Sequence, residues 1–387
     1  MLHTDMLRGF IELVRELYDE TFVPLHRPIF DGNERRYLVD CIDSNFVSSV
    51  GQKVVDFENE IASFTGSKYA VATVNGTSAL HVALELVGVR AGEEVITQAL
   101  TFVATCNAAS YIGASPLFID VDKDTLGLSS KALGVFLEEN VEVRESGAFN
   151  LKTGKRIAAC VPMHTFGLPC RIKEIVAICD RYKIPVVEDA AESLGSYVGS
   201  QHTGTFGKIG TLSFNGNKLI TTGGGGMIIT DDAKIAELAK HITTTAKVPH
   251  PYEFVHDVAG YNYRLPNLNA ALGCAQVERM PEMLAVKERI AKHYAEFFEE
   301  QSIEMLQPIE GAKSNYWLNG LIFESSGDRN EFLEYTNGEE VMTRPIWRPM
   351  HRLEMYSKCQ SDDLINTDWL EERVVNIPSS VPAGALG

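Results

Sequence analysis

The chain has 387 residues, of which 45% are hydrophobic and 22% are charged, and 35 basic and 52 acidic residues give it a net charge of −17. This composition is typical of a globular protein with room for a large core and two domains, and the acidic balance argues against nucleic acid or an anionic membrane surface as a partner. No run of about 18 apolar residues marks a membrane span, and the acidic N-terminal stretch does not resemble a signal peptide.

The cysteines indicate a reducing compartment. The seven cysteines are scattered and odd in number, several lie in apolar stretches, and none forms a close pair of the metal-binding kind. Reduced, buried thiols are expected from such a pattern. We therefore expect a cytoplasmic protein and no metal site.

The N-terminal segment predicts an amphipathic helix. Apolar residues recur every three or four positions between residues 5 and 19. The acidic polar face favours packing on the body of the protein or on a partner subunit over a membrane surface. Two prolines between residues 24 and 28 end this appendage, and further helices are expected at 33–44 and 54–65.

Residues 68 to about 235 have the sequence pattern of an α/β fold. Continuous apolar runs alternate with helical segments, which predicts a mostly parallel central sheet with helices on both faces. Ligands of such sheets bind beyond the carboxyl ends of the strands, so the residues that follow each strand are the informative ones. The expected strands are 69–74, 94–97, 116–120, 157–163 and 184–188, and the expected helices are 78–86, 103–112 and 172–182.

The sequence after residue 245 predicts a smaller α+β domain. A long helical pattern covers residues 265–300, with a predicted break near Pro281, and short strand and helix patterns follow at 316–323, 330–335 and 341–347. The predicted division of the chain is a helical appendage at 1–24, a large domain at 25–245 and a small C-terminal domain at 246–387.

Lys218 has unusual neighbours. It lies in TLSFNGNKLITTGGGG (211–226), between two predicted strands and just before four glycines, on neither an amphipathic face nor a charge run. Glycines let the main chain approach a ligand closely, so this lysine is well placed to touch a bound group. For an isolated match, a solvated lysine on a hairpin is the alternative.

Two acids follow another predicted strand. Asp189 comes directly after PVVE, and Glu192 lies three residues further on. A carboxylate at a strand end needs a cationic partner to offset its desolvation. Capping of a following helix is the alternative role for Asp189. A metal site is not indicated, because no histidine or third carboxylate lies at ligand spacing.

A candidate phosphate-binding site lies at the start of a predicted helix. Gly76 and Thr77 open a predicted helix after a strand, where unpaired N–H groups and hydroxyls bind phosphate. Ser213 is a second candidate, and Phe102 offers an aromatic face. Taken singly, an ordinary helix cap, a strand-end hydroxyl and a core phenylalanine explain these residues equally well or better. Together, the lysine, the acid, the candidate phosphate-binding site and the aromatic face suggest pyridoxal 5′-phosphate (PLP), which needs a Schiff-base lysine and an acidic partner for its ring nitrogen.

The sequence resembles the DegT/DnrJ/StrS family of PLP-dependent sugar aminotransferases. The resemblance extends from Pro24 to about Pro378, with the motifs in the family's order. It implies the fold-type-I, aspartate-aminotransferase-like architecture. The matching motifs are NGTSALHVAL (75–84), GEEVITQALTFVATCNA (92–108), HTFGLPC (164–170), VVEDAAESLG (186–195), GTLSFNGNKLITTGGGGMI (210–228) and GYNYRLPNLNAALG (260–273).

The resemblance implies roles for residues at the matching positions. Lys218 would hold the cofactor covalently and carry the proton, and a lysine there argues against the family's dehydratase branch, which has His. Asp189 would bind the ring nitrogen, and Glu192, where many relatives have Gln or His, the ring hydroxyl. The remaining cofactor contacts would be the phosphate ligands Gly76, Thr77 and Ser213, the stacking residue Phe102, and Asn262, which would reach the cofactor of the other subunit of a homodimer with shared active sites.

Within the family, the N-terminal helix and the segments PLHRPIFDGNE (24–34), DSNFVSSVG (43–51) and HTFGLPC (164–170) look most like the legionaminic-acid branch. The resemblance implies an aminotransferase that moves the amine of L-glutamate to a nucleotide-linked 4-keto-6-deoxy sugar. The nucleotide (UDP, GDP or dTDP) and the stereochemistry of the amine stay open. Amination of a 3-keto or non-nucleotide keto compound, and a non-catalytic regulatory homologue, are the alternatives.

Candidate substrate residues come from several segments. Arginine matches phosphate in a bidentate manner, which brings TRPIWRPMHR (343–352) into consideration. A solvated face is an equally good explanation for that run, and a satisfied core histidine is nearly as good for His164. The expected substrate contacts are His164, His250, Arg344, Trp347 and His351.

Overall fold

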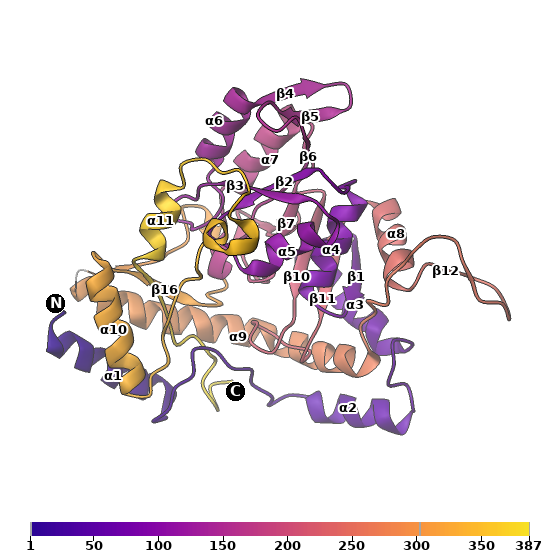
Figure 1. Ribbon diagram of the computed structural model, residues 1–387. Helices are drawn as coiled ribbons and strands as arrows, with labels where there is room; N and C mark the ends of the chain where they lie inside the picture. The colour runs from indigo at the N-terminus through magenta and orange to yellow at the C-terminus, as the bar shows by residue number, and fades with distance from the viewer. Residues whose placement is uncertain (1, 302, 387) are drawn as a thin grey trace.

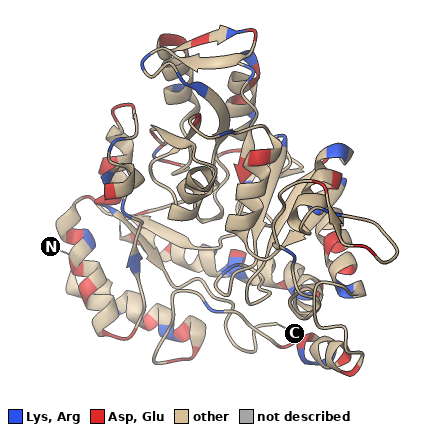
Figure 2. Cartoon of the chain, turned by 45° about the vertical axis from the view of Figure 1, so that its right-hand side comes forward, with Lys and Arg blue, Asp and Glu red and all other residues tan. Residues whose placement is uncertain are grey.

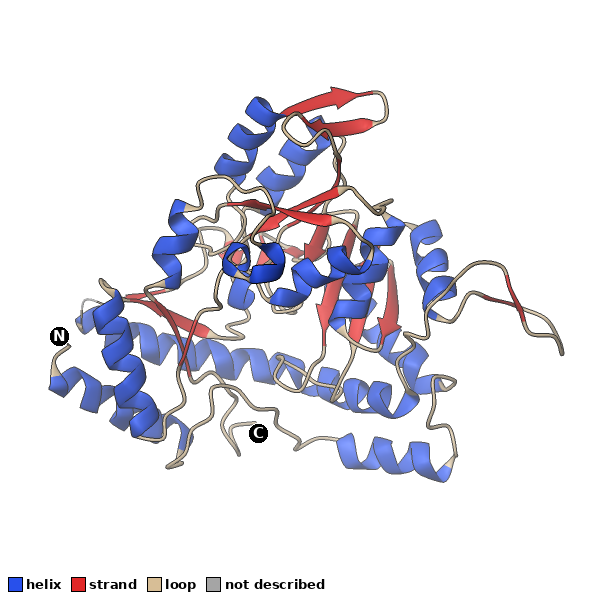
Figure 3. Cartoon of the chain, viewed as in Figure 1, coloured by secondary structure: helices blue, strands red, loops and turns tan. Residues whose placement is uncertain are grey.

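A central sheet organises the molecule in the computed structural model, which describes residues 2–301 and 303–386 (Figures 1 and 3). Across it lie β1 (Tyr69–Thr73), β11 (Gly226–Thr230), β10 (Ile209–Ser213), β7 (Val187–Asp189), β6 (Arg156–Val161), β2 (Glu94–Gln98) and β3 (Ser115–Ile119). The pairings from β10 to β3 are parallel, and β11 is antiparallel to both neighbours, so the sheet is mixed. Two parallel bridges, Cys160 with Val186 and Met163 with Asp189, join β6 to β7.

Helices cover both faces of this sheet. One face carries α4 (Gly76–Leu86), α5 (Val103–Tyr111) and α8 (Ala233–Thr243), and the other carries α3 (Gln52–Thr65), α6 (Ser130–Asn140), α7 (Ile172–Arg181) and α9 (Asn267–Glu300). Successive side chains of β11 point to opposite faces of the sheet and illustrate this division of the helices. Ile228 packs with the first group, whereas Met227 and Ile229 pack with α3 and α9. Burial on both faces explains the continuous apolar strands of the sequence.

The long helix α9 passes beneath the sheet without interruption (Figure 1). The predicted break near Pro281 is therefore wrong. Proline removes one backbone donor and crowds the preceding turn, which destabilises a helix interior. Here Met280 and Met283 on either side of it are buried, and burial continues to Phe298. Packing along the whole length of α9 outweighs the local cost of the proline.

The C-terminal part has its own sheet. It is antiparallel, with the order β14 (Glu304–Met305), β16 (Asn319–Ile322), β18 (Val374–Ile377) and β17 (Arg344–Pro345), and α10 (Ser326–Gly338) and α11 (Ile365–Glu371) accompany it. The N-terminal helix α1 (Thr4–Tyr18) packs here, where the Phe10 ring lies 5.1 Å from that of Phe332 in α10. The predicted amphipathic helix that packs on the body of the protein is thus confirmed. The outer bounds of the predicted division, residues 1 and 387, lie outside the described residues.

The remaining elements are short or peripheral. A hairpin of β12 (Lys247–Val248) and β13 (Val255–His256) projects from the body beside α8 (Figure 1). Figure 2 shows Lys, Arg, Asp and Glu distributed over the outer helices and loops. None of the described helices is long and apolar enough to cross a membrane. The bounds not yet given are α2 (Glu34–Asp43), β4 (Val141–Arg144), β5 (Gly147–Asn150), β8 (Tyr197–Val198), β9 (Gln201–His202) and β15 (Ala312–Lys313), with 3₁₀ turns at Thr165–Gly167, Met350–Arg352 and Glu354–Tyr356.

The glycine run after Lys218 brings β11 against the start of α4. A Cβ atom on Gly226 would lie 2.4 Å from the carbonyl carbon of Asn75, whereas one on Gly224 would meet nothing closer than 3.9 Å. The run was expected to let the chain pass a ligand closely. The close approach is instead to the backbone that precedes α4.

We expect Gly226→Ala to destabilise the protein by about 1–3 kcal/mol, because the added methyl group must displace the Asn75 backbone. Gly224→Ala is the matched control and should be close to neutral. Urea unfolding of both variants measures the difference. Equal stability of the two variants would contradict the close approach.

Candidate active site

The carboxyl ends of several strands converge on a cavity of about 320 Å³. Its walls come from the start of α4, the segments that follow β2, β6, β7 and β10, and two tryptophans of the C-terminal part. The lining residues are Asn75, Gly76, Thr77, Leu80, Phe102, Ala104, Met163, Asp189, Ala191, Glu192, Ser213, Asn215, Asn217, Lys218, Trp317 and Trp347.

Lys218 is held at the wall of this cavity. Its Nζ donates a hydrogen bond to Glu192 Oε1 at 3.2 Å and lies 3.9 Å from the centroid of the Trp317 ring. The side chain is only 13% exposed, so the alternative of a solvated lysine on a hairpin is wrong. A turn fixes its backbone, because the Lys218 N–H donates to the carbonyl of Asn215 at 3.0 Å.

Asp189 lies at the end of β7 and is buried. Its carboxylate accepts hydrogen bonds from the Thr105 hydroxyl at 2.8 Å and from the Ala191 N–H at 3.2 Å. Burial raises the pKa of Asp189, while these bonds and the charges of Lys218 and His164 oppose the rise. Turns follow β7 where a helix was considered, so Asp189 does not cap a helix.

Glu192 pairs with Lys218 at the wall of the cavity. Its other carboxylate oxygen accepts the Phe166 N–H at 2.9 Å. Burial raises the pKa of Glu192 to about 7, and the ion pair with Lys218 and the Phe166 N–H limit the rise. This carboxyl group can therefore hold or release a proton near neutral pH.

The start of α4 is arranged to bind an anion. Asn75 caps the helix, and its side chain accepts the Ser78 N–H at 2.7 Å. The N–H groups of Gly76 and Thr77, in the first turn, have no partner within the helix and adjoin the cavity. A Cβ atom on Gly76 would lie 2.9 Å from that of Ser213, so the end of β10 lies directly beside this turn.

Aromatic residues close the cavity on the side of the C-terminal part. Phe102 is 49% exposed, so it is not a core residue, and its ring lies 6.2 Å from that of Trp347. Trp347 in turn lies 5.0 Å from the ring of Phe166. Trp347 is the one expected substrate contact that lines the cavity within the described residues.

The other expected substrate residues lie elsewhere. His164 is fully buried behind the wall, where its Nε2 lies 3.0 Å from Glu188 Oε2 and its Nδ1 accepts the Cys170 N–H, so the structure gives it the role of a satisfied core histidine. Arg344 is exposed and donates to Asn337 at 2.8 Å, and His351 lies 3.5 Å from Asp368. Since neither lines the cavity, the structure does not bring them to the candidate site of their own chain.

Two expected residues lie on or near the projecting hairpin. His250 is exposed beside β12, and its Nδ1 accepts the Glu253 N–H at 2.8 Å. Asn262 is exposed, and its Oδ1 accepts hydrogen bonds from Arg264. Neither residue lines the cavity of its own chain.

Several residues at the site were missed from the sequence. Asn217 adjoins Lys218, and its carbonyl accepts the Trp317 Nε1–H at 2.7 Å. Trp317 lies about a hundred residues away in a segment whose sequence predicts only a strand, so no local pattern identifies it as a residue of the site. The Thr105 hydroxyl reaches Asp189 from α5, and a threonine on a helix is equally ordinary. The described residues contain no cluster of His, Cys, Asp or Glu placed to hold a metal ion.

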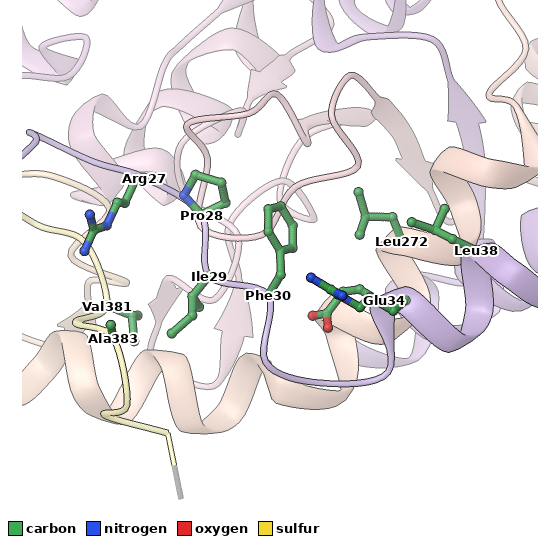
Figure 4. A pocket seen from close by; sticks show the side chains of 10 residues that line it. Arg27, Pro28, Ile29, Phe30, Glu34, Leu38, Leu272, Val381 and Ala383 are labelled. Atoms are coloured by element: carbon green, nitrogen blue, oxygen red, sulfur yellow. The ribbon is translucent and has the colours of Figure 1, made fainter.

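A second hollow, of about 530 Å³, lies away from these residues (Figure 4). It is formed by the segment before α2, the start of α2, Leu272 of α9 and the C-terminal segment. Its lining is Arg27, Pro28, Ile29, Phe30, Glu34, Arg35, Leu38, Leu272, Val381 and Ala383. It holds none of the expected catalytic or cofactor residues.

Comparison with known proteins identifies the family. The sequence profile of the DegT/DnrJ/EryC1/StrS aminotransferase family matches residues 28–383. The chain belongs to this family. It is 33% identical over 358 residues to the GDP-perosamine synthase of Escherichia coli O157:H7, with 92% of this chain and 93% of that one covered.

Solved structures agree on the fold. Helicobacter pylori PseC, an aminotransferase involved in the biosynthesis of pseudoaminic acid, has a TM-score of 0.84 at 21% identity, with 92% of this chain and 93% of that one covered. The E. coli GDP-4-keto-6-deoxy-D-mannose-3-dehydratase with bound hydrated PLP has a TM-score of 0.81 at 22% identity, with 93% and 96% covered. The chain therefore has the PLP-transferase fold.

The protein is a PLP-dependent transaminase, and the residues around the cavity fit that cofactor. Asp189 is a buried carboxylate that forms no ion pair with a lysine or arginine among the described residues, which suits a cationic ring nitrogen. The amine of Lys218 is on the cavity wall, and the first turn of α4 offers N–H groups to a phosphate.

We expect Glu192→Gln to change how stability depends on pH. The folded-state pKa of Glu192 is about 7, whereas a glutamate in an unfolded chain titrates at about 4.3. Between these values the folded protein holds a proton that the unfolded chain has released, so the stability of the wild type falls as the pH rises. Thermal unfolding of the cofactor-free proteins at about pH 5 and about pH 8 tests this. The stability of the variant relative to the wild type should be higher at about pH 8 than at about pH 5. A constant difference between the two proteins would contradict the raised pKa.

Proposed function

We propose that the protein moves an amino group from L-glutamate to the keto group of a nucleotide-linked 4-keto-6-deoxy sugar. The observation that carries the proposal is the meeting of Lys218, Asp189 and the first turn of α4 at one cavity. The relatives named GDP-perosamine synthases support a nucleotide-sugar substrate. The proposed product is a legionaminic-acid-type or other amino sugar of a surface polysaccharide.

We assign the following roles to the residues that line the cavity. Bound PLP supplies a ring that accepts electrons from the substrate carbon. Lys218 would hold the cofactor covalently and, when free, would take and return the proton of the substrate carbon. Asp189 would keep a proton on the ring nitrogen, and Glu192 would bind the ring hydroxyl. Gly76, Thr77 and Ser213 would bind the phosphate, and Phe102 would stack on the ring.

A homodimer with shared sites is part of the proposal. The segment around α2 and the β12–β13 hairpin leave large apolar side chains exposed, which is typical of a surface that another subunit covers. Asn262 and His250 are absent from their own cavity, so we assign them to the cavity of the other subunit. The exposed side chains are Phe22, Phe30, Val39, Ile42, Phe46, Val47, Val50, Tyr252, Phe254, Val255 and Val258.

Two further assignments complete the proposal. We assign a large domain to residues 25–245, a small domain to residues 246–387 and an appendage to residues 1–24, and the two separate sheets of the described residues support this division. The cytoplasmic location rests on the seven cysteines, which are all unpaired, and six of which are buried.

Lys218→Ala should lower the rate of transamination at least about a thousandfold, because the variant lacks both the covalent anchor and the proton carrier. The assay supplies L-glutamate with GDP-, UDP- or dTDP-linked 4-keto-6-deoxy sugars and follows 2-oxoglutarate. Lys234→Ala in α8, outside the cavity, is the control and should keep wild-type activity. Activity only on a 3-keto or non-nucleotide keto sugar would replace the substrate assignment, and no activity on any keto sugar would favour a regulatory protein.

Mixed dimers test the shared site. When Lys218→Ala and Asn262→Ala chains are co-expressed with different tags, one site of each mixed dimer combines an intact Lys218 with an intact Asn262. Random pairing makes half of the dimers mixed, so about a quarter of the wild-type activity should appear at limiting PLP. Activity no higher than the mean of the two separate variants would contradict Asn262 reaching across subunits.

A further inference from the structure

Lys287 of α9 is a buried cation that the chemistry described so far does not use. Its side chain is 1% exposed, and its Nζ donates to the carbonyl of Trp317 at 3.3 Å and to the carbonyl of Ser379. The third neighbour is His26 Nε2, also at 3.3 Å. These partners are neutral, and burial lowers the pKa of Lys287 to about 7. A lysine is almost never fully buried unless it is paired, so the hydrogen bonds of Lys287 must offset the cost of its burial.

What Lys287 holds is the backbone of Trp317. The Trp317 N–H donates to Asn315 Oδ1 at 2.8 Å, its carbonyl accepts from Lys287, and its Nε1–H donates to the carbonyl of Asn217 at 2.7 Å. The preceding residue, Tyr316, has φ +49°, a left-handed conformation that a non-glycine residue adopts only when its surroundings impose it. The ring so fixed lies 3.9 Å from Lys218 Nζ.

We infer that Lys287 is a positioning residue for Lys218, because it holds the Trp317 ring against the amine that binds the cofactor. The inference rests on the proposed role of Lys218. An aromatic face at this distance stabilises a cationic nitrogen, more so where water is excluded. Through Ser379 and His26, the same ammonium group also ties the C-terminal segment and the segment before α2 to this position.

The direction of an absorbance shift separates this role from a simple charge effect. Among the described residues, the charged or titratable groups that act electrostatically on Lys218 or lie beside Trp317 are Glu192, Asp189, His26 and Lys287. If Lys287 were only a nearby positive charge, its removal would make a cationic Lys218 nitrogen easier to form and raise the pH midpoint of the visible band of the bound cofactor. If it acts through Trp317, its removal withdraws the aromatic face and lowers the midpoint.

The experiment is a pH titration of that band in the holoenzyme for Lys287→Met, Trp317→Leu and the double variant. We expect Trp317→Leu to lower the midpoint by about one pH unit, Lys287→Met to lower it by less, and the double variant to show no further lowering than Trp317→Leu. Lys292→Met, the same substitution on an exposed position of α9, is the matched control and should leave the midpoint unchanged.

An unchanged or raised midpoint in Lys287→Met, or an equal lowering with and without Trp317, would overturn the inference. If Lys287→Met does not fold, Lys287→Gln keeps one donor for the Trp317 carbonyl and should lower the midpoint partially. Lys287→Met should also lower kcat by about tenfold with little change in KM, because a displaced Trp317 disturbs the amine rather than the sugar. Loss of the visible band in Lys218→Ala separately tests the role of Lys218, so failure of one inference is distinguishable from failure of the other.

Discussion

The ion pair between Lys218 and Glu192 joins the two strand ends on which the site depends. Lys218 follows β10, and Glu192 follows β7, its parallel neighbour, so their side chains meet at the same edge of the sheet. The pair is buried, which raises the carboxyl pKa to about 7 and keeps the amine close to the wall of the cavity. Asp189 and Ser213 lie at the ends of the same two strands, so they line the same cavity.

Parallel strand order explains why the sequence predicted so many of the residues that line the cavity. Seven of the expected cofactor residues lie at the end of a predicted strand or after one, and all seven line the cavity: Gly76, Thr77, Phe102, Asp189, Glu192, Ser213 and Lys218. The sheet rule converts this one-dimensional pattern into proximity, because the carboxyl ends of parallel strands share an edge. Local sequence therefore placed these residues at one cavity, whereas His164, which also follows a predicted strand, lies behind the cavity wall.

The sequence was less informative where tertiary contacts decide the outcome. The break expected at Pro281 does not occur, because packing along α9 outweighs the cost of the proline. The helices α6 and α8 and the β4–β5 hairpin were not predicted, and His164 pairs with Glu188 on the side of the wall away from the cavity. Trp317 and Lys287 contribute through a packing arrangement between distant segments, which no local periodicity encodes.

The C-terminal part is thus more than a cover over the sheet. Trp347 and Trp317 bring aromatic faces to Phe102 and to Lys218, and Asn315 bonds to the carbonyl of Glu192. The surroundings of the Lys218 amine are therefore formed by both parts of the chain. A small displacement of one part against the other would change the surroundings of Lys218, which links the packing of α9 to the chemistry of the site.

The most direct test of the account is to find where the cofactor is attached. The PLP-loaded protein is reduced with borohydride and digested, and its peptides are analysed by mass spectrometry. The account predicts a pyridoxyl phosphate adduct on Lys218, with loss of the visible absorbance band. An adduct on another lysine such as Lys287, or an unmodified Lys218 in protein that had the band, would contradict it.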